Sequence, residues 1–187
     1  MNATPASDSL RADHRMIEGI LDPLLEALLH LTPAAVDNVR RHFQEIQRLA
    51  APHFKREEDV FYPEIRAGNP SLLARMDEQH ADTRQIEAFL EELLASLPPA
   101  PGERDLKELQ RLGIEFHDAV QTHILDEEDH LLEFADRVLS AEEQGRLLVR
   151  MEEAVAGSPP CGGHEHPRET EGLNEKGTLA QWLTRSS

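Results

Sequence analysis

The sequence has few cysteines, few aromatic and β-branched residues, and no long apolar run. One cysteine among 187 residues cannot form an internal disulfide, and no apolar run approaches the roughly 18 to 20 residues that cross a bilayer. The chain has one Trp, one Tyr and six Phe, and β-branched residues are few beside abundant Leu, Ala, Glu, Gln and Arg. This composition favours helix over sheet and predicts an all-α protein.

Positive charge is also scarce. The 19 Lys and Arg residues are outnumbered by 36 Asp and Glu residues, which gives a formal net charge of −17. Such a charge opposes binding to nucleic acid and to anionic membrane surfaces, so we expect neither as a partner. The first residues, MNATPASDSL, lack the basic and apolar regions of a signal peptide, and we therefore expect a cytoplasmic protein.

Periodic apolar residues predict four long helical segments and a short fifth one. The segments cover about 7–30, 33–68, 70–97, 106–138 and 140–156. Helix-start signals precede three of them, at Thr32-Pro33, at Asn69-Pro70 and in a capping box at Ser140. Their lengths and the short breaks predict an up-down-up-down four-helix bundle with a short fifth helix over residues 1–156.

The apolar face of this predicted bundle carries six polar residues. They are His14, His53, Glu57, His80, His123 and Glu127. The pattern His-x-x-x-Glu occurs twice, at 53–57 and 123–127, and each copy places an imidazole and a carboxylate one turn apart on one helix face. His14 lies 18 residues before Thr32 and His53 lies 21 after it, so both are at a similar distance from that turn. The same count around the other turns places all six residues at one level of the bundle.

Each of these residues also has a simpler interpretation. A histidine on an apolar face is often a hydrogen-bonded core residue, but burying six such groups at one level costs several kcal/mol each unless something pairs with them. We therefore favour a metal site. His130 continues the apolar face and is either a partner of a metal ligand or a core histidine. His30, His42 and His117 lie off the face. The acidic neighbours of the two motifs are expected to be solvated: Glu58, Asp59, Asp126, Glu128 and Asp129.

The predicted donor set indicates which metal the site would hold. Four imidazoles and two carboxylates, with no thiolate, suit iron or manganese better than a structural zinc site. Six protein ligands exceed what one tetrahedral ion uses, so we expect two octahedral ions. If both carboxylates and an oxo or hydroxo group bridge them, about two coordination positions remain open for a small ligand.

The order and spacing of these residues resemble the hemerythrin-like family, also called the HHE cation-binding domain. The resemblance covers about residues 8–156 and includes HFKREE at 53–58 and HILDEE at 123–128. It implies a four-helix bundle that holds a non-haem di-iron centre, with iron preferred to manganese or zinc. It also implies terminal ligands at His14, His53, His80 and His123, and bridging ligands at Glu57 and Glu127.

Two positions depart from the oxygen-carrying members of that family. Arg84 stands where those proteins have a second histidine, one turn after the third-helix ligand. The last motif is His-x3-Glu, whereas the oxygen carriers have His-x4-Asp. The four-His, two-Glu set is more similar to the branch that includes iron-centre repair proteins and iron-sensing domains.

These features favour a di-iron protein that binds, senses or reacts with O2, NO or hydrogen peroxide, or that handles iron. Whether it is an enzyme stays open. As an enzyme it would be an oxidoreductase that reduces NO, decomposes peroxide or repairs iron centres, with electrons from an external donor. A ferritin-like oxidase needs two Glu-x-x-His pairs, and only Glu127 and His130 fit. The alternative is a metal-dependent regulatory or interaction module without turnover.

Residues 157–187 differ from the rest of the chain because they are rich in Gly, Pro and charge, and we predict a flexible tail. Cys161, His164 and His166 supply a thiol and two imidazoles there, which fits either a plain linker or a second metal site. The segment 179–183, which includes Trp182, is a candidate docking element for a partner protein or for the bundle itself.

Overall fold

The computed structural model describes residues 5–156, and every regular element in this range is helical. The helices are α1 (Ala6–Leu29), α2 (Val36–Arg56), α3 (Tyr62–Ile65), α4 (Pro70–Ser96), α5 (Glu103–Asp126), α6 (Glu133–Val138) and α7 (Ala141–Ala156). Two 3-10 segments, η1 (Pro33–Ala35) and η3 (Arg66–Gly68), and two π-helical segments, η2 (Glu57–Phe61) and η4 (Glu127–Leu132), join or continue them. The predicted all-α class is confirmed, whereas the predicted tail lies outside the described residues.

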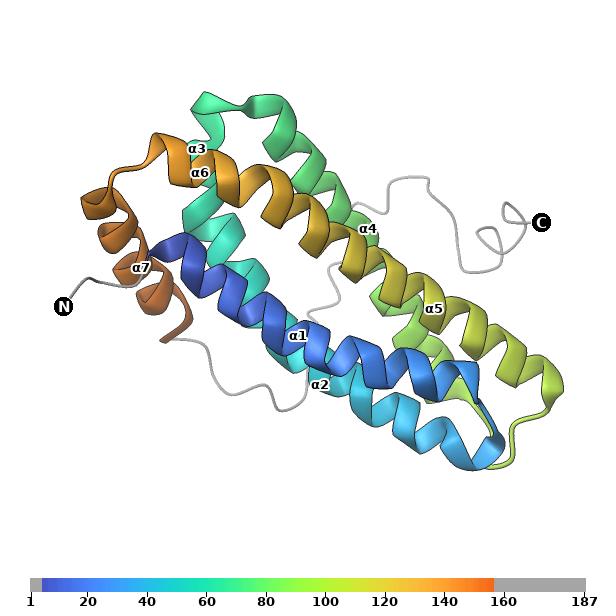
Figure 1. Cartoon of the computed structure of the whole chain (residues 1–187). Helices are drawn as coiled ribbons and strands as arrows, with labels where there is room; N and C mark the ends of the chain where they lie inside the picture. Colours follow the sequence, from blue (N-terminus) through green and yellow to red (C-terminus); the bar gives the residue numbers. More distant parts are fainter. Residues whose placement is uncertain (1–4, 157–187) are drawn as a thin grey trace, which may run out of the picture.

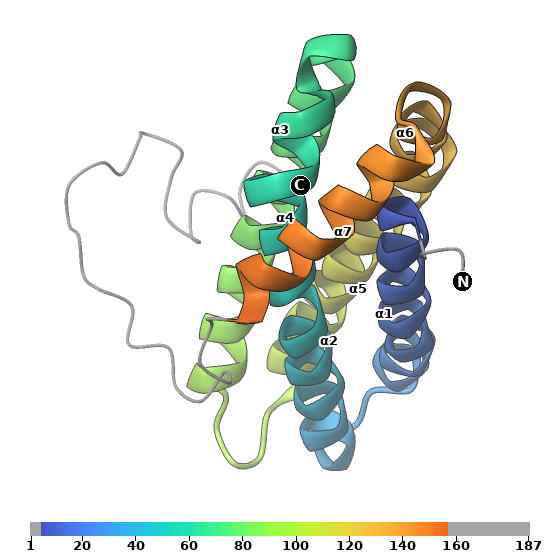
Figure 2. The same ribbon diagram turned by 90° about the vertical axis from the view of Figure 1, so that its left-hand side faces the viewer.

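The long helices lie side by side as a helical bundle (Figures 1 and 2). α1 packs against α2 and α5, and α4 packs against α5. α7 runs obliquely across the bundle and contacts α1, α2 and η2 (Figure 2). Among the described residues, no helix combines the length and the apolar character that crossing a membrane requires.

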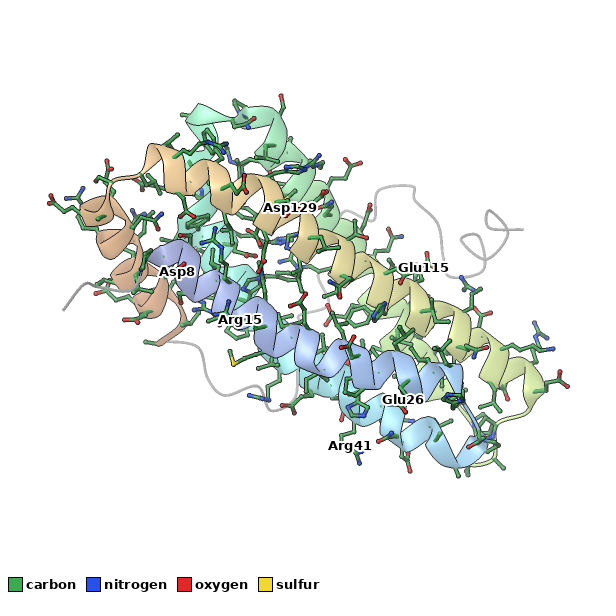
Figure 3. The ribbon with its side chains drawn as sticks, in the orientation of Figure 1. Asp8, Arg15, Glu26, Arg41, Glu115 and Asp129 are labelled. Atoms are coloured by element: carbon green, nitrogen blue, oxygen red, sulfur yellow. The ribbon has the colours of Figure 1, made fainter. Side chains whose placement is uncertain are left out.

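Exposed acidic side chains cover the outer faces of the helices. Asp8 and Glu26 of α1 and Asp129 of η4, labelled in Figure 3, are examples. Many of the acidic side chains are therefore solvated and lie outside the protein interior.

Two of the predicted helix starts carry the expected side-chain caps. The Asn69 side chain accepts a hydrogen bond from the backbone N–H of Leu72 at 3.3 Å, and Pro70 begins α4. At α7, the Ser140 hydroxyl accepts from the Glu143 N–H at 3.3 Å while the Glu143 carboxylate accepts from the Ser140 N–H at 2.7 Å. Thr32 differs because its side chain makes no cap hydrogen bond and the 3-10 segment η1 precedes α2.

Two apolar cores flank the level of the predicted metal site. The first core lies toward the α1–α2 and α4–α5 connections and includes Ile17, Phe43, Leu90 and Phe116. The second core lies toward α7 and includes Leu10, Phe61, Leu73, Leu131 and Met151. On α1 and α4 the cluster histidines lie between residues of the two cores. The first core includes residues of α2 and α5, and the second includes residues of η2 and η4, so apolar packing borders the site on both sides.

The π-helical segment η4 changes which residues are buried beyond Glu127. The apolar pattern predicts a buried face of Glu127, His130, Phe134 and Val138. The structure instead buries Leu131, Leu132 and Ala135. Because a π turn holds one residue more than an α turn, it rotates the residues that follow around the helix axis. His130 is exposed, and the prediction that it is a core histidine or the partner of a metal ligand is wrong.

Candidate metal centre

The six predicted residues meet in one buried cluster between the two apolar cores. It contains His14 from α1, His53 from α2, Glu57 from η2, His80 from α4, His123 from α5 and Glu127 from η4. Each of the six is at most 1% exposed. Their donor atoms form two groups, in each of which the atoms lie within 4.8 Å of one another. The first group is His14, His53, Glu57 and Glu127, and the second is Glu57, His80 and His123.

The imidazoles turn their Nε2 atoms toward one another and toward the carboxylates. The Nε2 atoms of His14 and His53 are 3.2 Å apart, and those of His80 and His123 are 3.0 Å apart. Glu57 spans the two pairs, because its Oε1 is 2.9 Å from His53 Nε2 and its Oε2 is 3.3 Å from His80 Nε2. One carboxylate therefore faces one histidine of each pair.

Glu127 is placed differently from Glu57. Its Oε2 lies 3.1 Å from His14 Nε2 and 3.7 Å from His123 Nε2, so one oxygen faces both imidazoles. Glu127 therefore belongs to the first donor group and only borders the second. The two His-x-x-x-Glu motifs look equivalent in sequence but do not contribute equally to the cluster.

The carboxylate oxygens of the cluster show that cations fit this site. All four oxygens of Glu57 and Glu127 are buried and accept no well-aligned hydrogen bond. Buried carboxylates without such partners are costly, and native proteins satisfy them with hydrogen bonds, paired charges or bound cations. Imidazole nitrogens and carboxylate oxygens are donor atoms that divalent metal ions accept.

Burial and neighbouring charges move the pKa values of the cluster residues in opposite directions. Burial alone would lower the pKa of His80, but the nearby carboxylates of Glu57 and Glu58 raise it to about 9. Burial, together with the charge of Glu57, raises the pKa of Glu127 to about 7. Burial holds the pKa of His123 well below its usual range. Without a cation, protons must neutralise the carboxylates, and bound metal ions would replace those protons.

Three of the four cluster histidines have a carboxylate on their outer nitrogen. Nδ1 of His14 lies 3.0 Å from Glu128, and Nδ1 of His80 lies 2.6 Å from Glu58. Nδ1 of His53 lies 3.3 Å from Asp13. Such contacts fix the ring orientation and leave Nε2 free for a metal ion. The prediction that Glu58 and Glu128 are only solvated flanks is wrong.

His123 is the exception, because an amide takes the place of the carboxylate. Its Nδ1 lies 3.3 Å from Oε1 of Gln79. The Gln79 amide nitrogen donates to Asp126 at 2.6 Å, which directs the amide oxygen toward the imidazole. Asp126 was expected to be solvated, and it instead orients Gln79.

Several residues at the site were missed from the sequence. Asp13 and Gln79 each precede a cluster histidine, a position that carries no recognised signal. The double Glu in HFKREE and HILDEE is a signal, because both copies place a second acid next to the cluster carboxylate. Tyr62 was also missed: it is fully buried, and its hydroxyl lies 3.2 Å from His80 Nε2.

Aromatic and cationic residues cover the cluster beside His80. The Phe54 ring packs on the His80 ring with centroids 4.1 Å apart. Arg84 lies over Phe54 and donates to Glu58 at 2.6 Å. Arg84 is exposed and so contacts the cluster only through these two residues.

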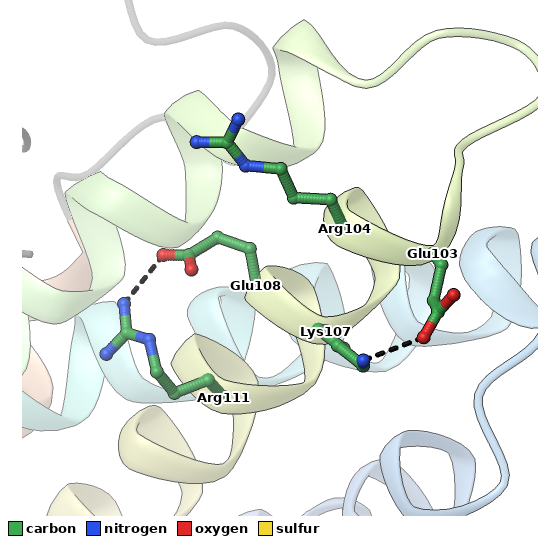
Figure 4. Close-up of a pocket in the computed structure, with 5 residues that line it drawn as sticks. All are labelled: Glu103, Arg104, Lys107, Glu108 and Arg111. Atoms are coloured by element: carbon green, nitrogen blue, oxygen red, sulfur yellow. Dashed lines mark hydrogen bonds and ion pairs between the residues drawn. The ribbon is translucent and has the colours of Figure 1, made fainter.

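The remaining candidate residues lie away from the cluster. His117 is 8% exposed, and its Nδ1 is 2.9 Å from Asp118. The surface pocket in Figure 4 lies on the first turns of α5 and is lined by Glu103, Arg104, Lys107, Glu108 and Arg111. Ion pairs at 2.7 Å join Lys107 to Glu103 and Arg111 to Glu108 (Figure 4). Cys161, His164, His166 and Trp182 lie outside the described residues.

The fold and the cluster together define an all-helical protein with a buried histidine and carboxylate site suited to metal ions. The family model of the hemerythrin HHE cation binding domain matches residues 6–135, more than half of the chain, and the protein belongs to that family. The match includes all six cluster residues and ends before α7. Comparisons with curated proteins and with solved structures gave no match.

Proposed function

We propose that this protein is a non-haem di-iron protein that binds, senses or reacts with O2, NO or hydrogen peroxide, or that handles iron. The observation that supports this most strongly is the pair of donor groups that share Glu57. One cation would bind His14, His53 and both carboxylates, and the other would bind Glu57, His80 and His123. Iron would supply reversible one-electron chemistry and open coordination positions for a small ligand.

The proposal includes an up-down-up-down four-helix bundle as the scaffold. Each of the four long helices brings one histidine to the cluster. These helices are α1, α2, α4 and α5. Metal ions at this level would therefore tie all four helices together. The predicted domain boundary at residues 156 and 157 is part of the same proposal.

Metal analysis tests the proposal. We expect about two iron ions per chain after expression in iron-replete medium, with near-ultraviolet bands of an oxo- or hydroxo-bridged diferric pair. Less than about one iron ion per chain, with zinc in its place, would contradict the assignment.

A regulatory or interaction module without turnover is the second candidate. It is supported by the position of the cluster between two apolar cores, because metal binding there couples to the packing of the whole bundle. Stopped-flow mixing of the reduced protein with NO or peroxide separates the two candidates. Repeated turnover with an added electron donor favours an oxidoreductase, and a single binding event favours the module.

An electron donor or partner protein that contacts residues 157–187 remains part of the proposal.

A further inference from the structure

Tyr62 is a fully buried residue whose hydroxyl points into the second donor group. The hydroxyl lies 3.2 Å from Nε2 of His80. That same nitrogen faces His123 Nε2 at 3.0 Å and Glu57 Oε2 at 3.3 Å. The phenol therefore reaches the side of His80 on which a metal ion would bind, not its outer side.

The π-helical segment η2 accounts for this position. Tyr62 follows Glu57 by five residues, and its backbone N–H donates to the Glu57 carbonyl across the wide turn. In a regular α-helix, a residue five positions later points about 140° away from the first. The extra residue in the π turn reduces that rotation, so Glu57 and Tyr62 face the same cluster.

The second donor group is also the one with fewer side chains. It has three donors, whereas the first group has four. A cation in the second group would therefore keep more positions for a ligand from solution. Glu58 and Gln79 contact the outer Nδ1 atoms of this half, whereas the Tyr62 hydroxyl contacts an inner Nε2 atom.

Metal binding would remove the present partner of the Tyr62 hydroxyl. In the structure the hydroxyl contacts His80 Nε2 and lies near the carboxylate of Glu127. The His80 lone pair would be used by the cation, and Glu127 would be a ligand as well. A buried hydroxyl without an acceptor costs free energy, so a ligand that accepts a hydrogen bond would be stabilised beside it.

We propose that Tyr62 donates a hydrogen bond to the small ligand that binds at the position formed by Glu57, His80 and His123. The hydroxyl then selects ligands that accept a hydrogen bond, such as anions and partly reduced oxygen or nitrogen species, over apolar ones. This inference rests on the proposed di-iron function. Tyr62 acts on the ligand and is not itself a metal ligand.

Azide is a suitable probe because it is an anion that accepts a hydrogen bond and gives a charge-transfer band with ferric ions. In the iron-loaded protein, Tyr62→Phe removes only the hydroxyl. We expect the azide Kd to rise by about ten- to a hundredfold, with the iron content and the near-ultraviolet spectrum unchanged. Phe61→Leu is the matched control, because Phe61 is the neighbouring buried aromatic residue in the second apolar core. Its azide Kd should stay within about twofold of the wild type.

A second measurement begins with the wild-type protein and does not depend on an affinity. If the phenol donates to bound azide, the infrared stretch of azide shifts between H2O and D2O, and Tyr62→Phe abolishes the shift. An equal azide Kd in Tyr62→Phe and wild type, or a wild-type stretch insensitive to D2O, would overturn the inference. Loss of one iron ion in Tyr62→Phe would also overturn it, because the phenol would then be a ligand. A wild type without iron overturns the proposed function itself, so the two failures are distinguishable.

Discussion

The two halves of the buried cluster differ although the two sequence motifs that supply them look alike. The first half gathers four donors and the second gathers three, with Glu57 in both and Glu127 in the first. In the first half, both histidines contact carboxylates through Nδ1, whereas in the second half His123 contacts the amide of Gln79. The comparison teaches that a repeated sequence motif can build two donor groups of unequal size.

The largest expected effect comes from removing what the two halves share. Glu57→Gln keeps the shape of the side chain but removes the charge that faces both histidine pairs. We expect iron to fall from about two ions per chain to less than about one, together with a lower Tm. Elemental analysis and thermal unfolding measure both. Retention of two iron ions would show that Glu57 is not the shared ligand.

A histidine variant in each half should separate the two positions. His53→Gln removes a donor of the first group, and His80→Gln removes a donor of the second. We expect each variant to keep about one iron ion per chain, and only His80→Gln to lose azide binding. Elemental analysis with azide titration distinguishes them. Equal loss of both ions in both variants would mean that the cluster binds metal only as a unit.

The outer contacts of the histidines provide a finer test of the difference. Glu58→Gln weakens the contact on His80 Nδ1, and we expect metal affinity in the second half to fall by about ten- to a hundredfold. Gln79→Glu should act in the opposite direction, because a carboxylate would make the His123 imidazole a stronger donor. Competition with a chelator of known affinity measures both variants. A fall in affinity for Gln79→Glu would contradict this account of the amide.

The smallest expected effect comes from residues 157–187. A chain that ends at Ala156 keeps all six cluster residues and α7. We expect the same iron content, diferric spectrum and azide Kd as in the full chain. A change in any of these after the deletion would place Cys161, His164 or His166 at the metal centre.

The level of the cluster could be predicted from the sequence because helices have a constant rise. Counting residues from each turn brings His14, His53, His80 and His123 to one height, and the structure gathers all four there. The helix starts at Asn69 and Ser140 were also predictable, because a side-chain cap depends only on a few neighbouring residues.

The unequal halves could not be predicted, because they depend on the π-helical turns. Leu131, Leu132 and Phe134 are all apolar, so the pattern looks continuous whether or not an extra residue enters the turn after Glu127. The same ambiguity hides Tyr62, which an ordinary helix would turn away from Glu57. The outer carboxylates Glu58 and Glu128 look like the solvated acids common on this chain until the helices are brought together.

The Mössbauer spectrum of the protein loaded with the iron-57 isotope tests the central claim most directly, because it reports the number, coupling and equivalence of the ions. The account predicts a diamagnetic, antiferromagnetically coupled diferric pair that gives two quadrupole doublets of equal area, one for each half. A magnetically split spectrum of isolated ferric ions would contradict the paired centre. A single doublet would contradict the inequality of the two halves.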